Sequence, residues 1–350
     1  MTTNLKDLSL PDLGEYFVSR GIPRYRADQV AGWLYQRGVE DPFEMTNLDA
    51  PLRERLARES QTRALSLDAL KRSSDGTRKL VLRSIEDGAV VEAVLIPEER
   101  RNTLCVSTQV GCPLSCSFCA TGAMGFTRNL TTAEIVDQVC RAQDVLEDPE
   151  RISNIVFMGM GEPLLNLPAV REAIRILTHP KAFAMAPRRI TVSTAGVLPK
   201  IRPLLEVGPI NLAVSLHAAR DEVRDVLVPL NRRFPLATLL AGLRKEDLIS
   251  ARRPVFFEYT LMKGVNDSPE DAGRLPGLLR GIPSKLNVIP MNPHADAPYQ
   301  PPDRETIDRF AAILHAGGLR VTLRRNRGAD IDAACGQLAA RSRRPLEPSS

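Results

Sequence analysis

Short apolar segments and helical segments alternate through the last two thirds of the chain, and this order limits the possible folds most. The apolar segments of strand type are TLCVSTQ, SNIVFM, RITVST, INLAVSL, PVFFEYTLM, KLNVIPM and LRVTL. Helical crossovers join parallel strands, so the order predicts a curved parallel sheet wrapped by helices. We therefore predict an α/β fold, a partial (β/α)6 TIM-like barrel over residues 101–328, because a full barrel would need more residues.

The first 75 residues predict a small helical accessory domain. Apolar residues recur at helical spacing in LGEYFVSRG, ADQVAGWLYQRG and APLRERLARES, and we expect helices up to about residue 70. Trp33 is the only tryptophan and is expected to anchor the core of this domain. The arginines of the domain suit contact with RNA, although they suit a solvated surface equally well.

Residues 76–100 predict a β-hairpin extension, because the apolar period changes to two and an Asp-Gly pair supplies the turn. The following TLCVSTQ segment is expected to pair back onto the hairpin, with Glu92 opposite Cys105 or Val106. A carboxylate in an apolar strand either faces solvent at a sheet edge or transfers a proton beside the cysteine.

Three cysteines, Cys112, Cys116 and Cys119, lie in one glycine-flanked loop after the first predicted barrel strand. The loop has no candidate for a fourth ligand nearby. Three thiolates can hold three irons of a [4Fe-4S] cluster and leave one iron open, and three protein ligands can also hold zinc. The spacing therefore predicts a metal centre with an open coordination position.

Polar motifs follow the ends of several predicted strands. Active sites of barrel enzymes lie at the carboxyl ends of the strands, so one pocket would collect these motifs. A ligand with amino, carboxylate and ribose groups needs acceptors and donors of this kind. The candidate binding residues are Gly161, Glu162, Ser193, Ser215, Leu216, His217 and Asn292.

Through CxxxCxxC and GEP the chain resembles the radical S-adenosylmethionine (SAM) superfamily. Within it, the chain resembles the adenine-C2 methyltransferases of ribosomal and transfer RNA along nearly its whole length. The matching stretches are YRADQVAGWLYQRGV, VVEAVLIPE, TLCVSTQVGCPLSCSFCATGAMGFTRNLTTAEIVDQV, FMGMGEPLLN, VSTAG, SLHA and RGADIDAACGQL. Ala329 departs from the family pattern, which often has an acidic residue there, and it has no assigned role.

The resemblance implies a radical SAM barrel in which Cys112, Cys116 and Cys119 hold a [4Fe-4S] cluster. It implies that the open iron and the candidate binding residues hold SAM, of which two molecules are used per turnover. The electron that starts the reaction would come from a donor such as flavodoxin or ferredoxin.

The resemblance also implies which residues carry the reaction. Cys335, in a C-terminal tail at 329–350, would accept a methyl group and become S-methylcysteine. Its methyl carbon would then join C2 of the target adenine in a covalent protein–RNA intermediate, and Glu92 would accept the C2 proton. Cys105 would release the product by forming a transient disulfide with Cys335. The implied substrates are 23S ribosomal RNA, at the peptidyl transferase centre, and the adenosine next to the anticodon of transfer RNA.

Two other functions are compatible with most of these residues. The first is methylation of adenine at C8 in ribosomal RNA, by the sister class of enzymes. The second is a non-catalytic iron-sulfur sensor that binds RNA. A sensor would not need Cys105, Cys335 and a cofactor pocket together.

The composition is compatible with a polyanionic partner and a reducing compartment. The chain has 47 basic and 42 acidic residues, a net charge of +5. It has no run of 18 apolar residues and a charged N-terminus, so we expect no membrane span and no signal peptide. Six cysteines, three of them clustered, favour metal binding over a disulfide framework. We expect a monomer in the cytoplasm.

Overall fold

A ten-stranded sheet organises the part of the chain that the computed structural model describes, namely residues 2–99, 101–147, 150–295, 297–324 and 326–339. Its strands are β3 (Leu65–Arg72), β4 (Arg78–Ser84), β5 (Val90–Glu98), β6 (Arg101–Cys105), β9 (Asn154–Phe157), β10 (Ile190–Thr194), β11 (Asn211–Ser215), β12 (Val255–Leu261), β13 (Ser284–Pro290) and β14 (Val321–Leu323). Their order across the sheet is β14-β13-β12-β11-β10-β9-β6-β5-β4-β3. The predicted barrel and the predicted hairpin therefore form one continuous layer.

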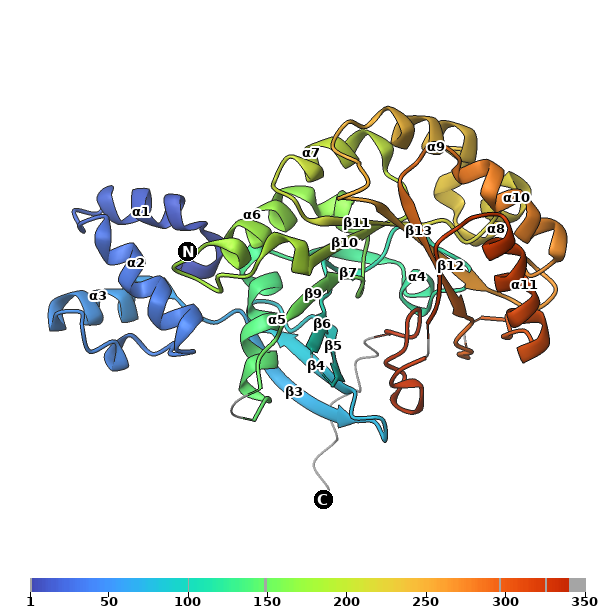
Figure 1. Cartoon of the computed structure of the whole chain (residues 1–350). Coiled ribbons are helices and arrows are strands. Elements are labelled where there is room, and N and C mark those ends of the chain that lie inside the picture. Colours follow the sequence, from blue (N-terminus) through green and yellow to red (C-terminus); the bar gives the residue numbers. More distant parts are fainter. Residues whose placement is uncertain (1, 100, 148–149, 296, 325, 340–350) are drawn as a thin grey trace, which may run out of the picture.

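The strands from β6 to β14 are parallel, each paired with the next in this order. The connecting helices are α5 (Thr132–Asp144), α6 (Leu167–Thr178), α7 (Ile201–Leu205), α8 (Asp221–Leu227), α9 (Leu236–Lys245), α10 (Pro269–Leu279) and α11 (Arg304–Ala316). They wrap the outer side of the curved sheet (Figure 1). Val192, Val214 and Phe257 on central strands are fully buried, as expected for a sheet covered on both faces. The predicted partial barrel is confirmed.

The strands β3, β4 and β5 pair antiparallel and extend the sheet beyond β6. The hairpin β4–β5 agrees with the prediction, but β3 begins at Leu65, so the prediction of helix up to about residue 70 is wrong. Most of β3 is exposed and a bulge falls between Leu67 and Ala69, which removes the regular apolar alternation of a strand. The predicted boundary at residue 75 assigned β3 to the helical domain, whereas it belongs to the sheet.

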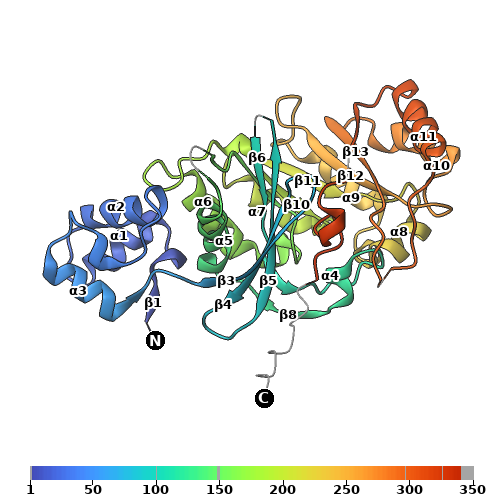
Figure 2. The same cartoon turned by 90° about the horizontal axis from the view of Figure 1, so that it is seen from below.

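The N-terminal helices form a separate layer beside α5 and α6 (Figures 1 and 2). They are α1 (Leu10–Val18), α2 (Tyr25–Ala31), which continues as a π-helical turn over Gly32–Gln36, and α3 (Ala50–Glu59), and the short parallel strands β1 (Thr3–Asn4) and β2 (Ser60–Gln61) close the unit. Trp33 is 9% exposed, and its indole N–H donates to Asn47 Oδ1 at 2.6 Å. Its predicted place in the core is confirmed.

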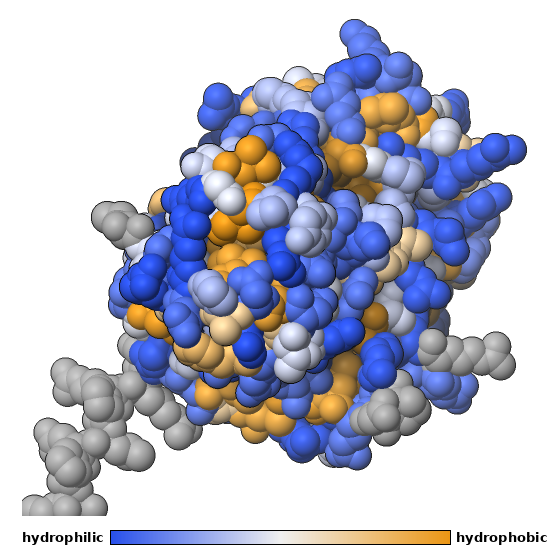
Figure 3. Space-filling model, turned by 90° about the vertical axis from the view of Figure 1, so that its left-hand side faces the viewer, coloured by the Kyte–Doolittle hydropathy of each residue, from blue (hydrophilic) through white to orange (hydrophobic). Residues whose placement is uncertain are grey.

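The outer face of these helices mixes apolar and hydrophilic side chains (Figure 3). Within the N-terminal unit, Phe43 is 55% exposed. The guanidinium groups of Arg20 and Arg37 lie over the rings of Tyr16 and Trp33, at 3.6 and 4.1 Å from the ring centroids.

A buried ion-pair network fixes the N-terminal unit against the barrel. Lys6 is fully buried, and its Nζ lies 2.5 Å from Glu40 Oε1 and 2.5 Å from Asp137 Oδ1 on α5. The other carboxylate oxygen of Asp137 accepts the backbone N–H groups of Ala64 and Leu65 at 2.9 and 2.8 Å. Each buried charge is thus paired, as burial in a protein interior requires.

Short elements frame the carboxyl ends of the barrel strands. The cysteine loop lies between β7 (Gln109–Gly111) and β8 (Phe126–Asn129) and includes α4 (Ala120–Ala123). A 3-10 turn over Ala329–Ile331 starts the tail segment, which lies beside α4 in both ribbon views (Figures 1 and 2). Residues 340–350 of the predicted tail lie outside the described residues. None of the helices in the described ranges is long and apolar enough to cross a membrane.

Candidate active site

The three predicted metal-binding cysteines lie together in the loop between β7 and β8. The backbone N–H of Cys112 donates to the carbonyl of Gly125 at 2.7 Å, and the N–H of Cys119 donates to the carbonyl of Cys116 at 3.1 Å. A Cβ at Gly122 would lie 2.9 Å from backbone atoms of Cys116, so a larger residue would push the loop open. The loop is therefore a closed turn that carries three thiols.

The three thiols lie close enough to influence one another. Burial raises the pKa of Cys112 to about 12 and that of Cys116 well above its ordinary value, and the neighbouring Cys119 thiol raises both further. Three thiolates from one loop are the ligand set of a [4Fe-4S] cluster with one open iron.

The tail segment that carries Cys335 is hydrogen-bonded to this loop. The backbone N–H of Ala120 donates to the carbonyl of Gly336 at 2.8 Å, and the hydroxyl of Thr121 donates to the carbonyl of Leu338 at 2.6 Å. From the opposite side, Asn292 Nδ2 donates to the carbonyl of Cys335 at 3.1 Å. Residues from the start and the end of the barrel thus hold the tail over the rim.

Cys105 and Cys335 lie near each other although they are far apart in the sequence. Burial is the main cause that raises the pKa of Cys105 to about 12, and the nearby Cys335 is the second cause. Cys335 is accessible to solvent, yet its protein surroundings desolvate it and raise its pKa above the ordinary value. The fold therefore brings the two predicted redox partners into one place.

The predicted register of Glu92 is wrong by two residues. Val94 lies opposite Cys105, because the turn between β5 and β6 is centred one residue later than the sequence suggested. Glu92 therefore does not face Cys105 or Val106 across the strands, and the hydroxyl of Ser107 donates to its carbonyl at 2.6 Å.

The Glu92 side chain contacts the tail instead. It is 4% exposed, and its Oε2 accepts the backbone N–H of Ala339 at 3.1 Å. Its Oε1 lies 3.2 Å from Nζ of Lys79, which also donates to the carbonyl of Asp332 at 3.0 Å. Glu92 and Lys79 thus grip the tail on both sides of Cys335. Lys79 was missed in the sequence, although the hairpin register places it diagonally across from Glu92.

The GEP loop lies against the end of β6, but its carboxylate is already occupied. Glu162 is 3% exposed, and its two carboxylate oxygens accept the backbone N–H groups of Leu164 and Ala195 at 3.0 and 2.8 Å. Burial raises its pKa. At Gly161, with φ +99°, a Cβ would lie 2.5 Å from Cβ of Gln109. The loop would meet a ligand mainly through its backbone, and Glu162 joins it to the next strand.

Four further predicted binding residues lie at the carboxyl ends of β10 and β11 or directly after them. Ser193 and Ser215 are partly exposed on these neighbouring strands, and Leu216 is fully buried behind them. His217 is 4% exposed with φ +56°, and its Nδ1 accepts the backbone N–H of Thr260 at 3.0 Å. Burial lowers the pKa of His217 to about 3. The ring is therefore neutral and presents an Nε2–H donor.

Two buried acceptors on this rim lack hydrogen-bond partners among the described residues. Oδ1 of Asn292, a predicted binding residue that is 3% exposed, is one of them. Oε2 of Glu258 on β12 is the other, while its Oε1 accepts from Asn287 Nδ2 at 2.8 Å. Unsatisfied buried acceptors need donors from a ligand or water. Glu258 was missed, because one carboxylate in the PVFFEYTLM strand gave no indication of which face it would take.

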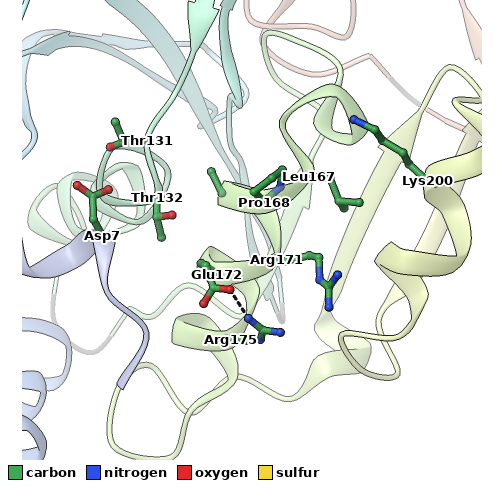
Figure 4. Close-up of a pocket in the computed structure, with 10 residues that line it drawn as sticks. Asp7, Thr131, Thr132, Leu167, Pro168, Arg171, Glu172, Arg175 and Lys200 are labelled. Atoms are coloured by element: carbon green, nitrogen blue, oxygen red, sulfur yellow. Dashed lines mark hydrogen bonds and ion pairs between the residues drawn. The ribbon is translucent and has the colours of Figure 1, made fainter. Parts of the chain in front are cut away.

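A cavity of about 730 Å³ lies outside this rim, between the N-terminal unit and the starts of α5 and α6 (Figure 4). Its lining includes Asp7, Thr132, Pro168, Arg171 and Lys200. None of its lining residues is a predicted site residue. This cavity is therefore separate from the cysteine site, and it marks the seam between the two parts of the protein.

Comparison with known proteins agrees with the geometry. Residues 106–275 match the Radical SAM superfamily, and residues 3–61 match the ribosomal RNA large subunit methyltransferase N-terminal domain. Proteins of Geobacter sulfurreducens and Halorhodospira halophila, both named dual-specificity RNA methyltransferase RlmN, are 49% and 48% identical to the chain. These matches cover 96% and 97% of this chain and 91% and 94% of the relatives. The chain belongs to the RlmN family of radical SAM RNA methyltransferases.

A solved structure supports the RlmN fold independently. The crystal structure of a radical SAM methyltransferase from Sphaerobacter thermophilus matches with a TM-score of 0.89 and 44% identity. The match covers 97% of this chain and 100% of that one. The resemblance predicted from the sequence motifs is thereby confirmed.

Membership of the radical SAM superfamily implies a [4Fe-4S] cluster and SAM, and the residues of the rim fit both groups. The three free thiols of the cysteine loop have the donor chemistry of an iron-sulfur site. The unpaired acceptors of Asn292 and Glu258 suit the ammonium and hydroxyl donors of SAM or of a nucleotide.

Proposed function

We propose that this RlmN family member transfers a methyl group to C2 of adenine in RNA, and that Cys335 carries the carbon. The observation that supports this most directly is the position of the tail. Cys335 is exposed to solvent near Cys105, on a segment hydrogen-bonded through Gly336 to the cysteine loop and through its own carbonyl to Asn292. A protein that only bound a cluster would not need a second thiol pair at this place.

In this proposal Cys112, Cys116 and Cys119 hold the cluster, and the backbone of the GEP loop holds SAM together with the rim residues. When bound, the two groups supply the methyl group and its one-electron activation. We infer that two SAM molecules are used per turnover, since a methyl group must first be placed on Cys335 before it can be activated there. The remaining SAM-binding candidates are Gly161, Glu162, Ser193, Ser215, Leu216, His217 and Asn292.

The chain's own residues then act in sequence. Cys335 holds the carbon as a thioether. Once the activation has removed a hydrogen atom from that methyl group, the carbon bonds to adenine C2 in a covalent adduct. Loss of the C2 proton is accompanied by loss of one electron, which the bound cluster would accept. Glu92 accepts the C2 proton, since it is a buried carboxylate that contacts the tail through Ala339. Cys105 gives up its thiol proton and attacks the sulfur of Cys335 to form a disulfide. The carbon then leaves Cys335, takes up a proton and becomes the product methyl group.

The N-terminal unit is proposed to bind RNA. The exposed guanidinium groups of Arg20 and Arg37 and the exposed ring of Tyr25 support this role, since cations and accessible rings contact phosphates and bases. Its rigid attachment through Lys6 would hold bound RNA in a constant position relative to the rim. We infer 23S ribosomal RNA and transfer RNA as substrates, in line with the dual-specificity name of the relatives.

Anaerobic reconstitution with iron and sulfide, followed by methylation of ribosomal and transfer RNA fragments, tests this function. Mass spectrometry of the nucleosides should find 2-methyladenosine in both RNAs. Methylation at C8 instead would assign the chain to the sister reaction. Absence of any methylated nucleoside and of 5'-deoxyadenosine after reduction would point to a sensor.

The Glu92→Gln variant should form the adduct but release little of the C2 proton, because the amide cannot accept it while it keeps the contact with Ala339. Loss of tritium from adenine labelled at C2 should fall by about 10²-fold or more. Glu98→Gln, at the exposed end of the same strand, is the matched control and should behave as wild type. Wild-type tritium loss from the Glu92 variant would remove Glu92 from the mechanism.

The reductant and the assembly state are further parts of the proposal. We infer that flavodoxin or ferredoxin reduces the cluster and that the protein acts as a cytoplasmic monomer. Reduction of the reconstituted protein by purified flavodoxin or ferredoxin checks the electron donor. Size-exclusion chromatography with light scattering checks the monomeric state.

A further inference from the structure

A fully buried arginine lies beneath the rim loops, and the reaction proposed above does not use it. Arg224, in the middle of α8, is 0% exposed. Arginine is almost never fully buried without a partner. Burial lowers its pKa to about 10, so the guanidinium stays charged at neutral pH. Its placement therefore needs a reason other than packing.

The guanidinium joins the loops that follow two neighbouring strands. Its Nη2 donates to the carbonyl of Ala195, after β10, at 2.7 Å and to the carbonyl of Ser215, at the end of β11, at 2.9 Å. Its Nε donates to the carbonyl of Leu216 at 2.9 Å, and Nη1 donates to Asn231 Oδ1 at 2.9 Å. These four acceptors are neutral oxygens. One rigid fork thus holds two segments that contain predicted SAM-binding residues.

Arg224 also links these segments to the cysteine loop. Arg224 lies on α8, whose last residue contacts that loop. At the end of the same helix, the carbonyl of Leu227 accepts the backbone N–H of Ser117 at 3.3 Å. Behind the fork, Asn231 Nδ2 donates to the carboxylates of Asp221 and Asp225 at 2.8 and 2.7 Å, so part of the buried charge is already compensated. An anionic cluster beside the same helix would add to that compensation.

We propose that Arg224 is a positioning residue of the cofactor site, which fixes the loops after β10 and β11 for SAM and raises the reduction potential of the adjacent cluster. The fixing of the two loops follows from the four hydrogen bonds that the planar guanidinium donates. A lysine at this position would have only three donors and no planar fork. The second effect follows from its buried positive charge, because the net charge around a cluster helps to set its potential. This inference depends on the cofactors of the proposed function but not on the target atom in RNA.

Two substitutions separate the two effects. Arg224→Lys keeps the charge and loses the fork, whereas Arg224→Gln loses both. The matched control is Arg220→Gln at the N-cap of α8, whose partly exposed guanidinium pairs with Asp271 on α10. After anaerobic reconstitution, iron content, melting temperature, SAM affinity by equilibrium dialysis, RNA affinity and the cluster midpoint potential are measured for each variant.

We expect Arg224→Lys to bind SAM about 10-fold or more weakly, with unchanged RNA affinity and a midpoint potential close to wild type. Arg224→Gln should bind SAM as weakly and should also show a more negative potential, while the Arg220 control keeps both values. Wild-type SAM affinity in Arg224→Lys would overturn the positioning role. A parallel fall of SAM affinity, RNA affinity and melting temperature would overturn it as well, in favour of general support of the fold. If instead Arg224→Gln keeps the wild-type potential, the electrostatic part is refuted.

Failure of this inference can be distinguished from failure of the proposed function. Nucleoside analysis of RNA treated with the wild-type protein decides the reaction independently of any Arg224 variant. The SAM affinity and the midpoint potential are read without turnover, so they decide the role of Arg224 even if the target atom is not C2.

Discussion

Replacing Cys335 with alanine should abolish RNA methylation and leave the cofactor site intact. The side chain would no longer offer a sulfur to carry the methyl carbon, so the product rate should fall by about 10⁴-fold or more. The cluster and SAM would still bind, because Asn292 and Ala120 contact only backbone carbonyls of the tail. Single-turnover assays with reconstituted protein, with iron content and SAM affinity measured in parallel, check both parts.

Cys140→Ala is the matched control for this variant. Cys140 is a buried thiol on α5 with no assigned role, so its removal should leave methylation unchanged. Methylated RNA produced by purified Cys335→Ala enzyme would refute the role of the tail thiol. Loss of iron from that variant would show that the tail is needed for the cluster itself.

Replacing Cys105 with alanine should stop the reaction after the adduct has formed. No thiolate would remain in position to attack the Cys335 sulfur, so turnover should fall by about 10³-fold or more while RNA stays attached to the protein. A band of protein–RNA adduct on denaturing gels, with the modified peptide located by mass spectrometry, would be the expected readout.

The double variant Cys105→Ala with Cys335→Ala is the control for that adduct. It should show no attached RNA, because the carbon carrier is missing. Released methylated RNA from the single Cys105 variant, without any adduct, would count against a resolving role. An adduct that survives in the double variant would place the attachment at another residue.

The local sequence predicted the barrel elements. The strand and helix order predicted the parallel sheet, because crossovers of that length allow few other arrangements. The three cysteines predicted the metal centre and the GEP loop a cofactor site, because the chemistry of each motif depends on close spacing along the chain. The edge strand β3 escaped detection, since most of its residues are exposed and its alternation is broken by a bulge.

The positions of charged residues depended on features with no local sign. The predicted pairing of Glu92 was wrong by two residues. When the centre of a turn moves by one residue, the partner of every residue in the hairpin moves by two, so that Val94 and not Glu92 lies opposite Cys105. Arg224 and Glu258 lie on a helix and a strand where a charge usually faces solvent, and only the folded chain shows that both are buried.

The chain by itself therefore determined the class of fold, the cluster loop and the rim on which the polar motifs meet, because these follow from short-range spacing and from strand direction. Only the tertiary structure decided which distant groups come together. It brought Cys335 near Cys105, gave Glu92 its contacts with Lys79 and Ala339, and closed four neutral oxygens around Arg224. Such contacts arise from long-range packing, in which the burial of the whole sheet sets positions that no neighbouring residues encode.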